Sequence, residues 1–306
     1  MTKKKNLTAF MIAIIVMLFS LPANAQGTVG YAQYDTNSKT LTFYGGEMPT
    51  TGAYELNTDS NKPGWNRDDD RVVASSCTKV VFDASFNDVR PNSCYFWFQG
   101  FSNLSIIEGI KYLNTDSVKY MQAMFYGCSG LTSLNLSNFN TANVEYMDNM
   151  FDGCSGLTSL DLSSFNTDNV TKMSQMFAAC SGLTTIYVSD DFKIGNVTDD
   201  GYYMFYDCTI LKGDTSYKPE YTDKYMANYN TGYFKTYYEL GGNKVELFGK
   251  QLTTNSLNLI GDKDFVAHAP FKANEATYSR DLSTSNSTWF SLCLPFAYTP
   301  GNNFTA

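Results

Sequence analysis

The chain has 306 residues and a formal net charge of −8, with 15% aromatic and only 17% charged residues. This acidic balance argues against nucleic acids and anionic membrane surfaces as partners, because binding to either one needs a basic surface. The length suits one long repeat array or a few small domains.

Residues 1–25 have the layout of a secretion signal. Three lysines, Lys3 to Lys5, precede an apolar run from Ala9 to Leu21, and Ala23-Asn24-Ala25 matches an A-x-A cleavage site. The apolar run is too short to span a bilayer, which needs about 20 residues. We therefore predict cleavage near Ala25 and a secreted or cell-surface protein, with no transmembrane segment in the mature chain.

Residues 26–76 are expected to form an N-terminal β cap, and a repeat of about 26 residues follows in residues 77–213. The best copies begin with Met-Phe and end with Cys-Ser-Gly-Leu. The copies lie at Trp97–Leu104, Met124–Leu131, Met150–Leu157, Met176–Leu183 and, in degenerate form, Met204–Cys208. Because the same residue types return over whole units, the pattern indicates a stacked repeat array.

Each unit combines two hydrophobic periods. Leu131, Leu134 and Leu136 follow the L-x-x-L-x-L pattern, which is strand spacing with one buried face. A stripe with helical spacing follows at Val144, Met147, Met150 and Phe151. Asn143 precedes this stripe as a predicted N-cap. Each unit is therefore predicted to hold one strand and one helix.

A single strand and helix cannot bury their own apolar faces, whereas stacked copies can. We therefore predict an α/β fold, namely a leucine-rich-repeat solenoid of about five turns over residues 77–213. Its parallel strands would form one face, and its helices would cover the other.

Residues 214–306 lose the repeat. The tyrosine-rich segment Tyr217–Phe234 is expected to close the end of the array. Short strands are predicted at Lys244–Phe248, Ser256–Ile260 and Trp289–Tyr298. We expect residues 214–306 to hold the terminator and the start of a β-rich region that is truncated, because the chain ends soon after the last strand.

Four cysteines form a periodic ladder at Cys128, Cys154, Cys180 and Cys208. Equivalent positions in successive turns point the same way, whereas a disulfide needs converging Cβ vectors. We therefore interpret these thiols as small buried hydrophobic groups. Cys77 and Cys94 fall in the first turn, and a disulfide between them stays open. Cys293 is left over, and the absence of C-x-x-C argues against a zinc site.

Catalytic and metal-binding patterns are weak in this sequence. The one histidine, His268, lies in a β-like segment without a recognisable triad around it. Asp190-Asp191, Asp199-Asp200 and Asp68-Asp69-Asp70 lack the Gly-spaced ligand loop of a calcium site and are interpreted as solvated loop charge. We predict no catalytic residues, no metal and no cofactor, although paired carboxylates for glycoside hydrolysis stay open.

Polar residues alternate with the buried leucines and are predicted to project from a concave strand face. They are Ser133, Asn135, Ser137, Ser159, Asp161, Ser163, Thr185 and Tyr187. Repeat arrays use such faces for binding, so one hypothesis is a hydrogen-bonding groove. The alternative is an inert, solvated sheet.

The repeats resemble those of the BspA-like family of bacterial leucine-rich-repeat surface proteins. The motifs that carry the resemblance are Met124–Leu136 and Asn138–Val144, and Leu157–Val170 is nearer still to the family pattern. Tyr31–Trp65 is similar to the family's β-hairpin cap, and Asn230–Phe234 to its terminator. One departure is Phe139 and its counterpart Phe165, which stand where better-known leucine-rich repeats bury an asparagine.

The resemblance implies a surface or secreted protein of host-associated bacteria that binds host extracellular or microbial surface proteins. Two alternatives stay open. The chain could be a glycan-binding protein, with the tail as the start of a β-sandwich, or a non-catalytic part of a secreted hydrolase.

Overall fold

The computed structural model describes residues 28–67, 72–240, 243–248, 251–260 and 271–279. The predicted signal peptide, Asp68-Asp69-Asp70, His268, Cys293 and the predicted strand Trp289–Tyr298 lie outside these residues. Within them, no helix has both the length and the apolar character needed to cross a membrane.

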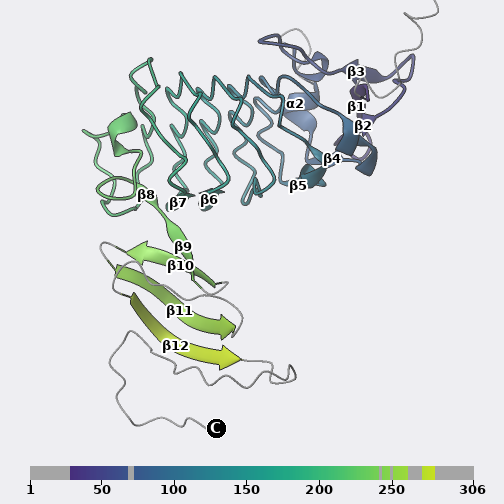
Figure 1. Ribbon diagram of the computed structural model, residues 1–306. Coiled ribbons are helices and arrows are strands. Elements are labelled where there is room, and N and C mark those ends of the chain that lie inside the picture. Colours follow the sequence, from purple (N-terminus) through teal and green to yellow (C-terminus); the bar gives the residue numbers. More distant parts are fainter. Residues whose placement is uncertain (1–27, 68–71, 241–242, 249–250, 261–270, 280–306) are drawn as a thin grey trace, which may run out of the picture.

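A five-stranded mixed sheet forms the N-terminal part, in the order β3-β1-β2-β4-β5 (Figure 1). β1 (Gly30–Asp35) and β2 (Thr40–Gly45) form an antiparallel hairpin, and β3 (Ala53–Glu55) pairs with β1 at the edge. β4 (Lys79–Phe82) runs parallel to β2, and β5 (Ile106–Glu108) runs parallel to β4. Because side chains alternate along β2, Leu41 and Phe43 are buried while their neighbours are half-buried.

Short helical segments lie between the strands along the chain. The 3₁₀ segments are η1 (Gly64–Asn66), η2 (Ala84–Asp88), η3 (Ile110–Tyr112) and η4 (Lys224–Met226). The one α-helix of the described residues, α2 (Val72–Ser76), has five residues.

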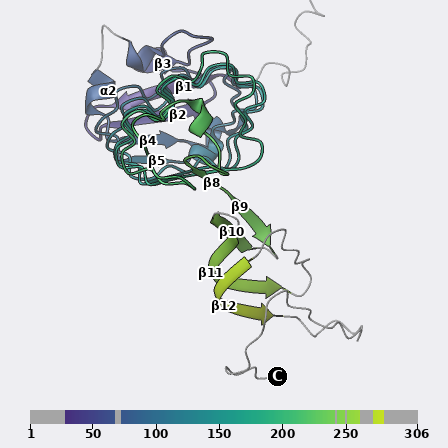
Figure 2. The same cartoon turned by 90° about the vertical axis from the view of Figure 1, so that its left-hand side faces the viewer.

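Irregular segments that repeat every 26 to 28 residues stack beyond the sheet, and Figure 2 shows their loops overlaid when viewed along the stack. β6 (Ser159–Leu162), β7 (Thr185–Val188) and β8 (Phe234–Lys235) form a parallel three-stranded sheet along one side. The region Leu131–Leu136, which was expected to match β6, contains no strand.

The phenylalanine rings at equivalent positions stack through the centre. The ring centroids of Phe125 and Phe151 are 5.7 Å apart, those of Phe151 and Phe177 are 5.8 Å apart, and those of Phe177 and Phe205 are 5.6 Å apart. Phe139 and Phe165 stack in the same way, with centroids 6.4 Å apart. Identical side chains therefore fill equivalent spaces in successive segments.

The prediction of an α/β leucine-rich-repeat solenoid is wrong, because no helices cover the far side of the stack. Where a helix was predicted, Met147, Asn149 and Phe151 donate their backbone N–H groups to the next segment, to the carbonyls of Lys172, Ser174 and Met176 at 3.0, 2.9 and 2.9 Å. An α-helix needs these donors for its own i−4 carbonyls. The fold is sheet-rich, with mixed and parallel sheets.

Residues with left-handed backbone conformation also interrupt any helix in these segments. Asn149 has φ 56° and Gly153 has φ 73°, which an α-helix does not contain. Between the lateral bonds, Met150 donates to Met147 O at 3.2 Å and forms a tight turn. Asn143 does not cap a helix, because its side-chain amide donates to Asp116 O at 2.7 Å in the preceding segment. We call the surface carried by these turns the turn face.

A four-stranded sheet follows the stack, in the order β12-β11-β10-β9. Its strands are β9 (Tyr237–Leu240), β10 (Asn243–Phe248), β11 (Gln251–Ile260) and β12 (Phe271–Ser279). The predicted strands Lys244–Phe248 and Ser256–Ile260 lie within β10 and β11. Figure 1 shows this sheet below β8, at the side of the stack that carries the strands.

Candidate binding surfaces

The strand face carries the eight polar residues predicted from the sequence. Ser133, Asn135, Ser137, Ser159 and Asp161 are exposed, and Ser163, Thr185 and Tyr187 are half-buried. The parallel register of β6 and β7 places Ser159 beside Thr185 and Asp161 beside Tyr187. The structure therefore brings these four residues together on neighbouring strands.

Tyr237 of β9 covers one end of this face. Its hydroxyl donates to the carboxylate of Asp161 and lies 3.1 Å from Ser163 Oγ. Its ring centroid is 5.3 Å from that of Tyr187. Asn135 is also engaged locally, because its side-chain oxygen accepts the backbone N–H of Ser137 at 3.0 Å. Much of the polar face is thus occupied by the chain itself.

The turn face aligns equivalent residues of successive segments. Phe96, Ala123, Asn149 and Gln175 each donate their backbone N–H to the next segment, at 2.9 to 3.1 Å, and each has φ between 51° and 60°. Tyr203 continues this column with φ 54°. The column is therefore a row of equivalent positions, at which Gln175 and Tyr203 are exposed whereas Ala123 is buried.

Five tyrosines gather at the last segment and the terminator, and we call them the tyrosine patch. Their exposed fractions are 60% for Tyr202, 57% for Tyr203, 56% for Tyr206, 50% for Tyr221 and 68% for Tyr225. The rings of Tyr203 and Tyr206 meet edge to face at 5.8 Å. A backbone bond of 2.9 Å from Phe205 to Thr222 holds the two parts of the patch side by side.

The repeat pattern alone did not predict this patch. The immediately preceding copy of the repeat has Ser174 and Gln175 where the last copy has Tyr202 and Tyr203. This change from polar to aromatic residues at solvent-facing repeat positions was the available signal. It was hidden because tyrosines of the terminator, such as the fully buried Tyr233, do close the end of the core.

A hollow of about 380 Å³ lies on the turn face near the N-terminal end, and we call it the turn hollow. It is lined by Ser60, Tyr95, Phe96, Gln99, Gln122, Ala123, Tyr126, Asp148 and Asn149. Ala123 stands in the column where the adjacent segments place Phe96 and Asn149, so its small side chain leaves room.

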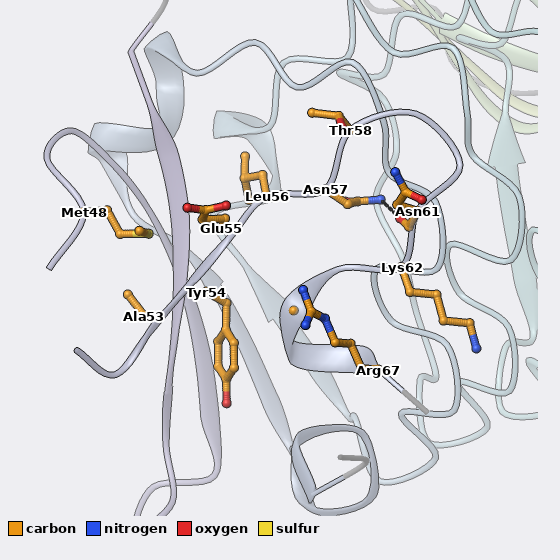
Figure 3. Close-up of a pocket in the computed structure, with 11 residues that line it drawn as sticks. Met48, Ala53, Tyr54, Glu55, Leu56, Asn57, Thr58, Asn61, Lys62 and Arg67 are labelled. Atoms are coloured by element: carbon orange, nitrogen blue, oxygen red, sulfur yellow. Dashed lines mark hydrogen bonds between the residues drawn. The ribbon is translucent and has the colours of Figure 1, made fainter. Parts of the chain in front are cut away.

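A wider hollow of about 1060 Å³ lies beside β3 (Figure 3). Asn57 anchors its wall by donating to Asn61 O at 2.7 Å and accepting from Trp97 Nε1 at 2.6 Å. Figure 3 shows Glu55 and Arg67 on opposite sides of this space. Its lining is polar and of mixed charge, which suits solvent as well as a polar ligand.

Burial affects the carboxyl groups at the centre of the turn face. It raises the pKa of Asp152 to about 6 and also raises the pKa of Asp148. Burial acts in the same direction on Asp199, but hydrogen bonds from Ser174 and from the backbone of Gly201 and Met173 outweigh it and lower the pKa. Asp199 is therefore held in its charged form by its own chain.

The periodic cysteines are buried and free. Cys128, Cys154 and Cys180 direct their thiols to carbonyls of the preceding segment at 3.0 to 3.1 Å, and Cys208 does so at 2.9 Å. Burial raises the pKa of Cys208 to about 12 and raises those of the other three as well. Cys77 and Cys94 are also free and buried, so no disulfide joins them.

Metal ligands do not gather in the part of the chain that the structure describes. Among those residues, no three His, Cys, Asp or Glu side chains lie close enough together to hold a metal ion. Of the acids considered as loop charge, Asp190 is engaged by the hydroxyl of Tyr229, and Asp199 accepts backbone N–H groups.

Comparison with known proteins gives one match. A family model described as "Mycoplasma protein of unknown function, DUF285" matches residues 92–217, which is the stacked region together with the start of the terminator. No curated protein and no solved structure matches the chain.

Proposed function

We propose that this chain is a secreted or cell-surface binding protein that recognises protein ligands on host or microbial surfaces through its tyrosine patch. The observation that carries the proposal is the exposure of five neighbouring tyrosines by half or more of their surface. Tyrosine supplies a large contact area with a polar tip, and it is enriched in protein interfaces and their hot spots.

The support beneath the patch is rigid. Met204 and Phe205, which lie between the exposed tyrosines in sequence, are completely buried. A rigid aromatic surface loses little conformational entropy when a partner binds. The signal-like residues 1–25 and the resemblance to BspA-like surface proteins support delivery to the outside of the cell.

The test uses the mature chain on an array of purified extracellular-matrix proteins and bacterial surface proteins. A variant with Tyr202→Ser, Tyr203→Asn and Tyr206→Ser removes most of the patch. Asparagine tolerates the left-handed backbone at position 203. We expect an affinity loss of at least about tenfold, because hot-spot residues contribute at this level.

The matched variant alters the strand face by Ser133→Ala, Asn135→Ala and Ser137→Ala, and it should bind like the native protein. Circular dichroism and urea unfolding establish that both variants fold. If the strand-face variant loses binding while the tyrosine variant keeps it, the patch is not the site. If the native chain binds no protein on the array, the proposed function is wrong.

A further inference from the structure

The turn hollow has the size of a small-molecule site. Its volume of about 380 Å³ falls within the range of about 300–1,000 Å³ that is typical of ligand pockets. The backbone around it is fixed by lateral hydrogen bonds, including Phe96 N to Gln122 O at 3.1 Å and Ala123 N to Asp148 O at 3.0 Å. The hollow is therefore a lasting feature of the stack.

Aromatic rings line one part of the hollow. The rings of Tyr95 and Phe96 lie 4.1 Å apart, and Tyr126 is 39% exposed. Aromatic faces are apolar and slightly negative, so they pack well against the C–H groups of a sugar ring. Amide and carboxyl groups of Gln99, Gln122 and Asp148 line the remainder, and such groups bond to hydroxyls.

Two acceptors in this lining lack a hydrogen-bond partner. They are Gln122 Oε1 and Asp148 Oδ1, and no other buried side-chain nitrogen or oxygen of the residues that the structure describes lacks a partner. Buried polar atoms are nearly always hydrogen-bonded, so an unpaired one calls for an explanation. Both side chains are half-buried and line the hollow, so a ligand that supplies donors is a candidate partner for the two acceptors.

One acidic and one basic group border the hollow, so an ionic ligand of either sign gains little net attraction there. The carboxyl group of Asp148 repels an anion. Lys62 Nζ already lies 5.0 Å from the centroid of the Phe96 ring and repels a second cation. A neutral ligand with many hydroxyl groups is repelled by neither charge.

We propose that the turn hollow binds a neutral saccharide unit, with the sugar ring packed against Tyr126 and its hydroxyls donating to Gln122 and Asp148. This site shares no residue with the tyrosine patch, so it does not depend on the proposed protein ligand. The protein would then carry two recognition sites on one face.

The test titrates the mature chain with three methyl glycosides, those of mannose, galactose and N-acetylglucosamine, by saturation-transfer NMR and calorimetry. We expect saturable binding of at least one glycoside, weakened about tenfold by Tyr126→Ala through loss of the packed ring. Gln122→Leu should weaken binding to a similar degree. It should nevertheless preserve or raise the free energy of unfolding, because it removes an unpaired acceptor.

Tyr206→Ala is the matched control, because Tyr206 occupies in the last segment the position that Tyr126 has beside the hollow. It should leave glycoside binding unchanged while it weakens the protein contact of the tyrosine patch. The saccharide site is wrong if no glycoside binds saturably, or if Tyr126→Ala and Gln122→Leu both bind like the native chain. It is also wrong if tetramethylammonium binds at the hollow in preference to the glycosides.

Discussion

Single residues in this protein satisfy the backbone of the neighbouring segment. Thr141 is 1% exposed, and its hydroxyl donates to Asn166 O at 2.7 Å and accepts from Asn166 N at 2.9 Å. Thr115 and Thr167 do the same one segment before and after, with Asn140 and Lys193. A buried hydroxyl can fill both roles because it has a donor and two acceptor lone pairs.

Asp152 makes the stability depend on pH. Burial raises its pKa in the folded protein from 3.8 to about 6, so the folded state binds its proton more tightly than the unfolded state does. The free energy of unfolding should therefore fall as pH rises from about 4 through about 6, where the buried carboxyl must ionise. Asp152→Asn should remove this part of the decline in urea-unfolding curves measured across that range.

Asp207→Asn supplies the control for this measurement, because it neutralises an exposed acid in the last segment. Its pH profile should parallel that of the native protein. If the free energy of unfolding of Asp152→Asn also followed the native pH dependence, Asp152 would not be the group that causes the decline.

At the scale of elements, the turns replace helices because neighbouring segments approach closely enough to share backbone hydrogen bonds. Gly130, Gly156 and Gly182 permit this approach, since each lies against carbonyl oxygens of the preceding segment. A Cβ on Gly156 would come within 2.6 Å of Leu131 O and closer still to Ser129 O. These glycines are needed for space, and none of the three has a positive φ.

Gly156→Ala should lower the free energy of unfolding by about 2 kcal/mol or more, because a backbone carbonyl cannot move aside as a flexible side chain can. Urea unfolding measures the change. Gly195→Ala is the matched control, since a Cβ at that glycine meets nothing within 4 Å. Equal free energies of unfolding for the two variants would show that the segments can move apart at Gly156 without loss of stability.

At the scale of the whole molecule, one hydrophobic core joins the N-terminal sheet to the stack. It includes Phe43 of β2, Phe125 and Phe151 of the stack, and Phe234 of β8. Segments that share both a core and lateral hydrogen bonds gain stability from their neighbours. We therefore expect the sheet and the stack to unfold together.

Thiol labelling tests the cooperativity among the stacked segments. In the native protein, iodoacetamide should leave Cys128, Cys154 and Cys180 unmodified, because all three are completely buried and burial raises the pKa of each thiol. With increasing urea, mass spectrometry of the labelled peptides should show the three thiols reacting at one common midpoint. Separate midpoints would show independent segments, and thiols that never react after unfolding would indicate disulfides.

Some features of the molecule could be predicted from local sequence. The 26-residue spacing of Phe125 and Phe151 gave the repeat, and the alternation of Leu160 and Leu162 gave the strand that the structure has as β6. The helical stripe from Val144 to Phe151 misled, because its spacing also suits consecutive tight turns that point the same side chains inward. Periodicity reports which residues face the core, and it does not report where the backbone donors go.

The candidate sites were less accessible to sequence reasoning. The strand-face residues share a face, but Tyr237 arrives from beyond the repeats and covers Asp161. The turn hollow depends on Ala123 lying between Phe96 and Asn149 in space, which only the lateral bonding establishes.

The sequence by itself determined the period, the residues that fill the core and the signal-like start. It could do so because the apolar side chains that each segment buries recur at a regular spacing along the sequence. Tertiary structure alone decided that the backbone N–H groups donate to the next segment rather than within a helix. The outcome depends on how close the next segment lies. That same closeness determines which side chains remain exposed on the turn face.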